Sequence, residues 1–254
     1  MLDQIISIVC SAGEIVRGAQ DIAAHTHLKT SVADLVTDYD VAVEHFLKKE
    51  LLTLIPDAVF YGEEEQEHTS PNTGWAYVVD PIDGTCNFVR GFRQSAISVA
   101  LLKDGELRCA VIYDPAKEEL FSAEKGKGAF LNGEPIHVSD KPLSEGLFIV
   151  GTAIYRREFI SPTISLTEQL LRRSCDFRRF GAAALDLAYI ACGRAEVFFE
   201  YSLSPWDYAA GALLIEEAGG KVTTMEGTPL VFDRRCSVWA ANAQSYAILN
   251  EVTI

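Results

Sequence analysis

Apolar residues recur every three or four positions at the start of the chain, and this spacing predicts an amphipathic helix over residues 1–20. The same spacing predicts a second helix from about Asp40 to Leu54, with Pro56 just beyond its end. Similar patterns later in the chain indicate helices over residues 162–173, 182–192 and 205–218.

After Pro56 the pattern changes to short, uninterrupted apolar runs, which are typical of buried strands. Two of these runs flank Lys103-Asp104-Gly105 and predict a hairpin, and Asn132-Gly133 is a strong signal of a two-residue turn. The expected strands are residues 58–61, 75–79, 97–102, 107–113, 177–180 and 195–199. Because strands and helices alternate without a regular βαβ rhythm, we predict mixed layers of the α+β class.

The composition is that of an ordinary globular protein, with 48% hydrophobic and 23% charged residues. No apolar run is long enough to span a membrane, and the N-terminus lacks the basic start and apolar block of a secretory signal. The six cysteines are scattered and form no C-x-x-C pair. We therefore expect a cytoplasmic protein with reduced cysteines.

The chain carries 36 acidic and 22 basic residues, which gives a net charge of −14. This charge argues against nucleic-acid and membrane partners, because their phosphates would be repelled. An enzyme that handles a phosphorylated small molecule would meet the same repulsion. Bound divalent cations would remove it by turning a group of carboxylates into a local positive site.

Acidic residues stand at the ends of several expected elements. Glu63 and Glu64 follow the strand at 58–61, Asp80 and Asp83 follow the strand at 75–79, and Asp207 lies in the first turn of the helix at 205–218. Each has an ordinary alternative when taken singly. The two glutamates would be exposed charges of an acidic stretch, Asp83 would cap a short helix, and Asp207 would face a helix dipole.

The segment Asp80-Pro81-Ile82-Asp83-Gly84-Thr85 is harder to explain in these ordinary terms. Pro81 fixes its own φ and biases Asp80 toward an extended backbone, so a stiff turn presents the two carboxylates. Gly84 lets a phosphate approach the backbone closely, and the amides of Gly84 and Thr85 would open a helix, which is a favourable anion site. Two hard oxygen ligands beside an anion site suit magnesium and a phosphoryl group together.

These motifs resemble the inositol monophosphatase family in both order and spacing. The three signature segments are Gly62-Glu63-Glu64, Asp80-Pro81-Ile82-Asp83-Gly84-Thr85 and Trp206-Asp207-Tyr208-Ala209-Ala210-Gly211. The likeness runs along nearly the whole chain. It includes Leu35-Val36-Thr37 with Asp40, the segment from Gly181 to Leu187, and Glu200.

The resemblance implies an alternating αβαβα sandwich, a homodimer and inhibition by lithium. It also implies that residues 1–254 form one catalytic unit, in which residues 1–140 would bind metal and phosphate and residues 141–254 would complete the substrate site.

The resemblance further implies a site with two or three magnesium ions. The expected ligands are Glu63, Asp80 and the Ile82 carbonyl for the first ion, and Asp80, Asp83 and Asp207 for the second. A third, weaker ion would bind Glu63 and water. Asp40 and Thr85 would orient and help deprotonate the attacking water.

Phosphate would bind the amides of Gly84 and Thr85, and Asp207 would lie beside the substrate as well as the metal. Glu200 matches the family position that bonds a polyol hydroxyl, and Ala183 and Ala184 match the positions where the polyol ring packs. Lys29 is either a cation near the third metal or a solvated lysine. Arg178 and Arg179 are either surface charges or partner contacts.

The leading interpretation is a phosphatase that acts on inositol 1-phosphate or a related sugar or polyol phosphate. Fructose 1,6-bisphosphatase activity, alone or in addition, is the next alternative. A 3′-nucleotide bisphosphatase is disfavoured by Cys86-Asn87, because such branches of the family tend to carry lysine after the threonine. The alternative outside the enzymes is a catalytically silent family member that binds a partner.

Overall fold

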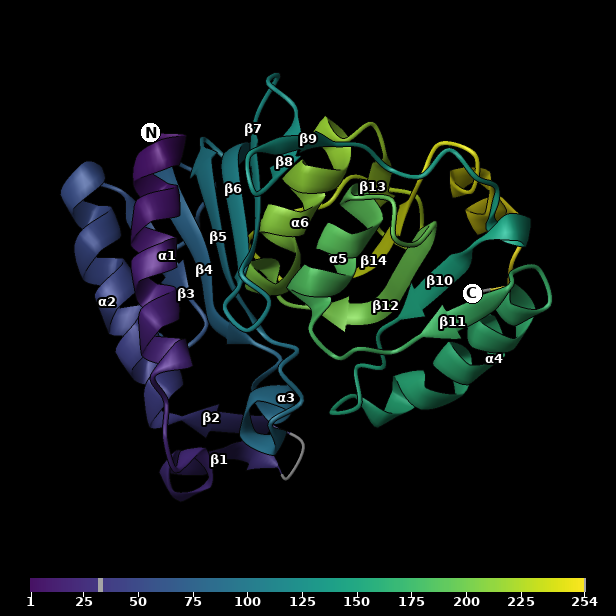
Figure 1. Ribbon diagram of the computed structural model, residues 1–254. Coiled ribbons are helices and arrows are strands. Elements are labelled where there is room, and N and C mark those ends of the chain that lie inside the picture. The colour runs from purple at the N-terminus through teal and green to yellow at the C-terminus, as the bar shows by residue number, and fades with distance from the viewer. Residues whose placement is uncertain (32–33, 254) are drawn as a thin grey trace.

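The computed structural model describes residues 1–31 and 34–253 of the chain. Its helices and sheets lie in five alternating layers, which Figure 1 shows nearly edge-on. A pair of helices covers a seven-stranded sheet, a second pair separates it from a five-stranded sheet, and one helix covers the outer face of the latter. The predicted alternating sandwich of the α+β class is thereby confirmed.

The elements have the following bounds. The α-helices are α1 (Leu2–Arg17), α2 (Asp38–Leu54), α3 (Thr85–Arg90), α4 (Ile160–Leu171), α5 (Ala183–Ala191) and α6 (Pro205–Glu217). The 3-10 helices are η1 (Ile22–His25), η2 (Leu143–Glu145), η3 (Arg157–Phe159) and η4 (Tyr246–Asn250). The strands are β1 (Thr26–Ser31), β2 (Asp34–Thr37), β3 (Val59–Gly62), β4 (Trp75–Asp83), β5 (Ala96–Lys103), β6 (Glu106–Asp114), β7 (Glu119–Glu124), β8 (Ala129–Leu131), β9 (Glu134–Ile136), β10 (Leu147–Val150), β11 (Asp176–Arg178), β12 (Val197–Leu203), β13 (Lys221–Thr223) and β14 (Cys236–Ala241).

The seven-stranded sheet has the order β3-β4-β5-β6-β7-β8-β9, in which only β3 and β4 run parallel. Along its central strands, successive side chains face opposite layers. Val79 and Val99 pack with α1 and α2, whereas Val78 and Ala100 pack with α5 and α6. Burial on both faces explains why these strands read as uninterrupted apolar runs.

The inner helices α5 and α6 are almost entirely buried between the two sheets. Gly211 of α6 lies against Leu187 of α5 so closely that any Cβ there would overlap the leucine. The five-stranded sheet, with the order β11-β10-β12-β14-β13, closes the other side of the core. Leu166 and Leu170 of α4 pack on its outer face.

The predicted elements occur, with shifted bounds. The expected hairpin is β5–β6, and Asn132 and Gly133 both take positive φ in the turn between β8 and β9. The strand expected at 75–79 continues to Asp83, past a register irregularity opposite β5. The helix expected to open at Gly84-Thr85 is α3. The β1–β2 hairpin and the strands β7, β8, β9, β10, β13 and β14 were not predicted from the sequence, because most of them are short.

All six cysteines are free thiols, in agreement with the expectation of reduced cysteines. Among the helices of the described residues, none combines the length and the apolar character needed to cross a lipid bilayer.

Candidate active site

The end of β4 positions the two central carboxylates. The side chains of Asp80 and Asp83 are 1% and 8% exposed, and the regular pairing with β5 is interrupted between them. The Asp80 carboxylate folds back on its own turn, since its Oδ1 accepts a hydrogen bond of 3.0 Å from the Ile82 amide. The stiff turn that Pro81 predicts therefore holds Asp80 in place.

Gly84 makes the sharp turn between β4 and α3. Its φ is +82°, and a Cβ would lie 2.9 Å from the carbonyl oxygen of Gln94. A side chain at this position would be both conformationally strained and crowded. The next residue, Thr85, begins α3, so the predicted sequence of acid, glycine and helix start is present.

Asp83 caps a helix that begins one hundred residues later in the chain. Its Oδ1 accepts a hydrogen bond of 3.2 Å from the Ala183 amide, and its Oδ2 accepts one of 2.7 Å from the Ala184 amide. These amides open α5, whose positive dipole end favours a carboxylate. The ordinary alternative from the sequence, a cap on the helix that directly follows Asp83, is wrong, because Gly84 occupies that N-cap position.

Asp40 and Thr85 form the hydrogen-bonded pair that the sequence predicts. The Thr85 Oγ1 lies 3.1 Å from Asp40 Oδ1 and 3.0 Å from the carbonyl oxygen of Ile82. The other oxygen of Asp40 accepts bonds from the amide and the hydroxyl of Thr37, which caps α2. The Asp40 carboxylate is thus fully buried and held in one orientation.

Lys29 in β1 contacts both glutamates that follow β3. Its Nζ lies 2.9 Å from Glu63 Oε1 and also donates to Glu64. The interpretation of Glu64 as an exposed charge is wrong, because its side chain is 12% exposed and its amide donates to Glu44. Lys29 is likewise paired with the site, and is not a solvated lysine.

Two further acids approach from the other sheet and the inner helix. Asp207 lies in the first turn of α6, and its Oδ2 accepts a bond of 2.7 Å from the Ser204 amide. Glu200 in β12 is buried, and its Oε1 accepts a bond of 2.7 Å from the Ala153 amide. The interpretation of Glu200 as a solvent-facing strand end is therefore wrong.

The four acids proposed as metal ligands, Glu63, Asp80, Asp83 and Asp207, act on one another electrostatically. Burial is the main reason that the pKa of Asp80 lies well above its ordinary range, and the charges of the other three raise it further. Burial also raises the pKa of Asp83 to about 7 and raises that of Asp207, and Glu63 contributes in both cases. The carboxylates are therefore close enough to share a counter-charge.

The donor set fits a hard divalent cation. It consists of oxygens, and within the described residues Asp80 Oδ2 and Asp207 Oδ1 accept no hydrogen bond. No three Asp, Glu, His or Cys side chains of residues 1–31 and 34–253 already surround one point as a metal site. Since Glu63 Oε1 is bonded to Lys29, a cation bound to this carboxylate would compete with the lysine ammonium.

Three further residues near the carboxylates carry little or no signal in the sequence. Asp186 of α5 is buried beside Asp83 and Glu200, and its Oδ1 has no hydrogen-bond partner within the described residues. Its signal in the sequence was an acid inside an otherwise apolar helix. Tyr155 and Arg235 lie near Asp207 and Glu200 and carried no recognisable signal.

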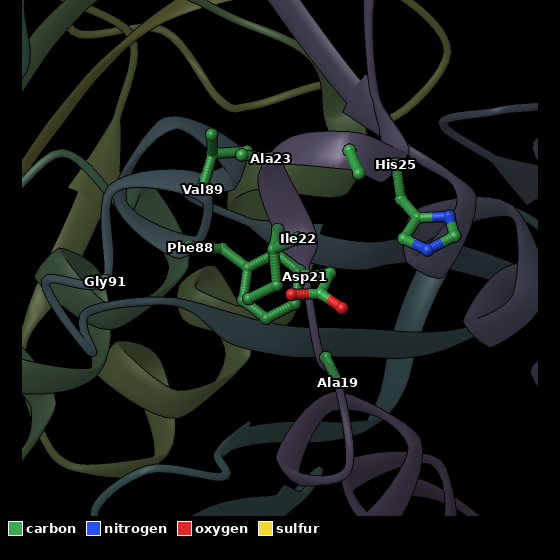
Figure 2. Close-up of a pocket in the computed structure, with 9 residues that line it drawn as sticks. Ala19, Asp21, Ile22, Ala23, His25, Phe88, Val89 and Gly91 are labelled. Atoms are coloured by element: carbon green, nitrogen blue, oxygen red, sulfur yellow. The ribbon is translucent and has the colours of Figure 1, made fainter.

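A separate, open cavity of about 590 Å³ lies on the surface beside α3. Figure 2 shows its walls, which come from η1 with the segment before it and from Phe88, Val89 and Gly91. None of the predicted site residues lines this cavity. The acidic residues predicted from the sequence therefore lie in the carboxylate cluster and not at this cavity.

Comparisons with known proteins agree with the resemblance. The family model described as the inositol monophosphatase family matches residues 1–253. An inositol-1-monophosphatase from Rhizobium meliloti is 38% identical over 231 residues, which cover 89% of this chain and 86% of that protein. The Nus factor SuhB of Xylella fastidiosa is 38% identical over 233 residues, which cover 89% and 84%.

Among solved structures, the inositol monophosphatase from Anabaena superimposes with a TM-score of 0.86 at 33% sequence identity. The match covers 98% of this chain and 93% of that one. The shared architecture and the match along the whole sequence lead to one conclusion: this chain belongs to the inositol monophosphatase family.

Proposed function

We propose that the protein is a magnesium-dependent phosphatase that hydrolyses a small phosphomonoester, with inositol 1-phosphate as the first candidate substrate. The observation that carries the proposal is the convergence of Glu63, Asp80, Asp83 and Asp207, which are far apart in the sequence, on one electrostatically coupled cluster. A turn with an open helix start, Gly84-Thr85, adjoins this cluster.

In this proposal, Glu63, Asp80 and the Ile82 carbonyl would hold one magnesium ion, and Asp80, Asp83 and Asp207 would hold a second. Glu63 contributes to a third, weaker site. When bound, the ions lower the pKa of water and neutralise charge on the phosphoryl group and the leaving oxygen. Membership of a family whose activity depends on metal is consistent with this ligand set.

Thr85 and Asp40 would handle the proton of the attacking water. The Thr85 hydroxyl has one proton and two acceptors within reach, Asp40 Oδ1 and the Ile82 carbonyl oxygen. In this proposal it donates to Asp40, so its oxygen lone pairs remain available to accept from a water. Burial raises the pKa of Asp40 to about 6, which leaves it ionised at neutral pH yet basic enough to take a proton. The water proton would pass to Thr85 as the Thr85 proton passes to Asp40.

The backbone would orient the phosphate, and the second sheet would orient the alcohol. The amides of Gly84 and Thr85 at the start of α3 would donate to phosphoryl oxygens. Glu200 would accept a hydrogen bond from a substrate hydroxyl, while Ala183 and Asp207 would line the space beside it. Ala183, the first residue of α5, has a small side chain beside which a ring would pack, whereas Ala184 is fully buried.

The test is phosphate release from inositol 1-phosphate, with magnesium and with a chelator, by the wild-type protein and by Asp207→Asn. We expect magnesium-dependent turnover that falls at least about a hundredfold in the variant, the equivalent of roughly 2.7 kcal/mol of transition-state stabilisation. Asp57→Asn is the control, because Asp57 is an exposed aspartate between α2 and β3. Equal turnover in chelator and in magnesium would contradict the proposal.

Alternatives remain for the substrate and for the class of function. Fructose 1,6-bisphosphate and 3′,5′-nucleotide bisphosphates are the next substrates to compare. A catalytically silent protein that binds a partner is the alternative outside the enzymes, and several relatives carry the name Nus factor SuhB. Magnesium binding without hydrolysis of any small phosphomonoester would favour that alternative. The homodimer and the lithium inhibition stay predictions.

A further inference from the structure

The loop between β10 and η3, residues 151–155, organises the end of the site opposite the phosphate turn. The Ala153 amide donates to Glu200 Oε1, and Ala153 has a φ of +38°, which is unusual for a residue other than glycine. Glu200 also packs against the bare Cα of Gly151, where any Cβ would overlap its carboxylate. The loop therefore fixes Glu200 tightly.

The same loop holds two arginines from distant parts of the chain. The Arg179 Nη2 lies 3.1 Å from Thr152 Oγ1, and the Arg235 Nη1 lies 3.4 Å from the Tyr155 hydroxyl. The Arg235 guanidinium also lies over the Tyr155 ring, 5.3 Å from its centre. Both arginines are exposed, so their charged groups stand at the rim of the site rather than inside the core.

Neither arginine forms an ion pair within 4.0 Å among the described residues, although the chain has 36 acidic residues. Their sequence neighbours behave differently. Arg178 pairs with Asp176 at 2.6 Å, and Arg234 pairs with Asp233 at 3.6 Å. In each of the two consecutive pairs, Arg178-Arg179 and Arg234-Arg235, the first arginine forms an ion pair with a nearby aspartate. The second arginine forms none among the described residues, so its charge is available to a ligand.

The two available charges act on the same carboxylate. Burial raises the pKa of Glu200 to about 7, while the charges of Arg179 and Arg235 act in the opposite direction. Arg235 is also close enough to Asp207 and Glu63 to be affected by their charges. The region around Glu200, where a substrate alcohol would lie, is therefore bordered by two cations.

An uncharged polyol would make little use of these cations. A guanidinium binds phosphate or carboxylate oxygens through two parallel hydrogen bonds, and such charge-assisted bonds are about twice as strong as neutral ones. In a chain with a net charge of −14, cations at the rim would also offset the repulsion of a multiply charged substrate.

We propose that Arg235, assisted by Arg179, binds a second negatively charged group on the alcohol part of the substrate. This inference rests on the proposed phosphatase function and narrows its substrate class. The preferred substrates are sugar or polyol phosphates that carry a further phosphate or a carboxylate. Arg235 is then a specificity-determining residue, which binds the substrate without taking part in the bond breakage.

The test compares Arg235→Gln with its matched control Arg234→Gln on three substrates. Inositol 1-phosphate has an uncharged alcohol, fructose 1,6-bisphosphate adds a phosphate, and 6-phosphogluconate adds a carboxylate. We expect Arg235→Gln to lower kcat/KM about tenfold or more for at least one of the doubly charged substrates, mainly through KM. Arg235→Gln lowers kcat/KM for inositol 1-phosphate by a factor at least about fivefold smaller, because that substrate has no second charge, and Arg234→Gln changes kcat/KM for all three substrates less than about twofold.

The two doubly charged substrates identify the source of the second charge. A loss confined to fructose 1,6-bisphosphate indicates a phosphate site, and a loss confined to 6-phosphogluconate indicates a carboxylate site. Arg179→Gln, with Arg178→Gln as its control, should lower kcat/KM for the same substrate by a smaller factor than Arg235→Gln does. Thermal unfolding of each variant checks that the fold is intact.

An equal effect of Arg235→Gln on all three substrates, or no effect on any, would overturn the inference while leaving the phosphatase function in place. If the wild-type protein hydrolyses none of them with magnesium bound, the proposed function fails instead. Titration calorimetry with fructose 1,6-bisphosphate and 6-phosphogluconate then decides the inference. Tighter binding of either by the wild type than by Arg235→Gln supports it, and equal affinities for both overturn it.

Discussion

The buried carboxylates lead us to predict an unusual dependence of stability on pH. Without divalent cations, the protein should become less stable as the pH rises from 5.5 to 8. The pKa of Asp83 in the folded protein is about 7, against an ordinary value of about 4. A raised carboxyl pKa means that the folded state binds the proton more tightly than the unfolded chain does. The stability that this proton supplies is complete below pH 4 and is lost as the pH rises through 7.

The size of the effect follows from the same numbers. A difference of about three pKa units corresponds to about 4 kcal/mol, and roughly half of it, about 2 kcal/mol, falls between pH 5.5 and pH 8. In a protein of this size each kcal/mol shifts Tm by about 2–4 °C, so the titration of Asp83 alone should lower Tm in chelator by about 4–8 °C. Magnesium at about one hundred times its Kd would restore about 2.7 kcal/mol.

The assay is calorimetric unfolding of the wild type and of Asp83→Asn at the two pH values, in chelator and in magnesium. The variant removes the charge at this position, so in chelator its fall in Tm with pH should be smaller than that of the wild type by about 4–8 °C. Part of the fall remains, because burial also raises the pKa of Glu200 to about 7 and that of Asp40 to about 6. The variant should also lose most of the magnesium effect. At pH 8 in chelator we expect it to be at least as stable as the wild type, because the lost repulsion exceeds the roughly 1 kcal/mol of a weakened cap on α5. A variant clearly less stable than the wild type there would refute the reasoning.

Three further predictions concern single residues of the site. Thr85→Val removes the hydroxyl within hydrogen-bond distance of Asp40, so it should lower kcat about a hundredfold or more in steady-state kinetics. The magnesium concentration that gives half-maximal activity should stay unchanged in a magnesium titration. Gly84→Ala should lower Tm by about 2–8 °C, since a side chain at φ +82° costs about 1–2 kcal/mol and meets the Gln94 carbonyl; an unchanged melting curve would contradict the strain argument. Lys29→Gln should tighten magnesium binding about two- to fivefold in titration calorimetry, because the ammonium no longer competes for Glu63, and weaker binding would show that Lys29 assists the metal instead.

The elements of the fold with strong periodic patterns were predictable from the sequence alone. The outer helices α1 and α2 have an apolar face that the spacing reveals, and the central strands read as apolar runs because both their faces are covered. Short elements such as β10, β13 and the β1–β2 hairpin were not predictable, because a few residues carry no measurable period. The partners of β10 and β13 are later strands of the five-stranded sheet, whereas β1 and β2 pair with each other.

The residues of the proposed site could also be selected from the sequence. The Asp80–Thr85 segment has a local reason for each residue, and the geometry of its turn depends mainly on Pro81 and Gly84. The motifs around Glu63 and Asp207 added the remaining acids through their resemblance to the family.

Only the tertiary structure decided how those residues are used. The cap of Asp83 on α5, the contact of Lys29 with Glu63, and the loop that ties Arg235 to Glu200 all join segments far apart in sequence. The pKa values depend on the same packing, because burial and neighbouring charges raise them and neither can be read from local composition. Sequence patterns act over a few residues, whereas charge and burial act through space, and this difference sets the limit of what the sequence alone reveals.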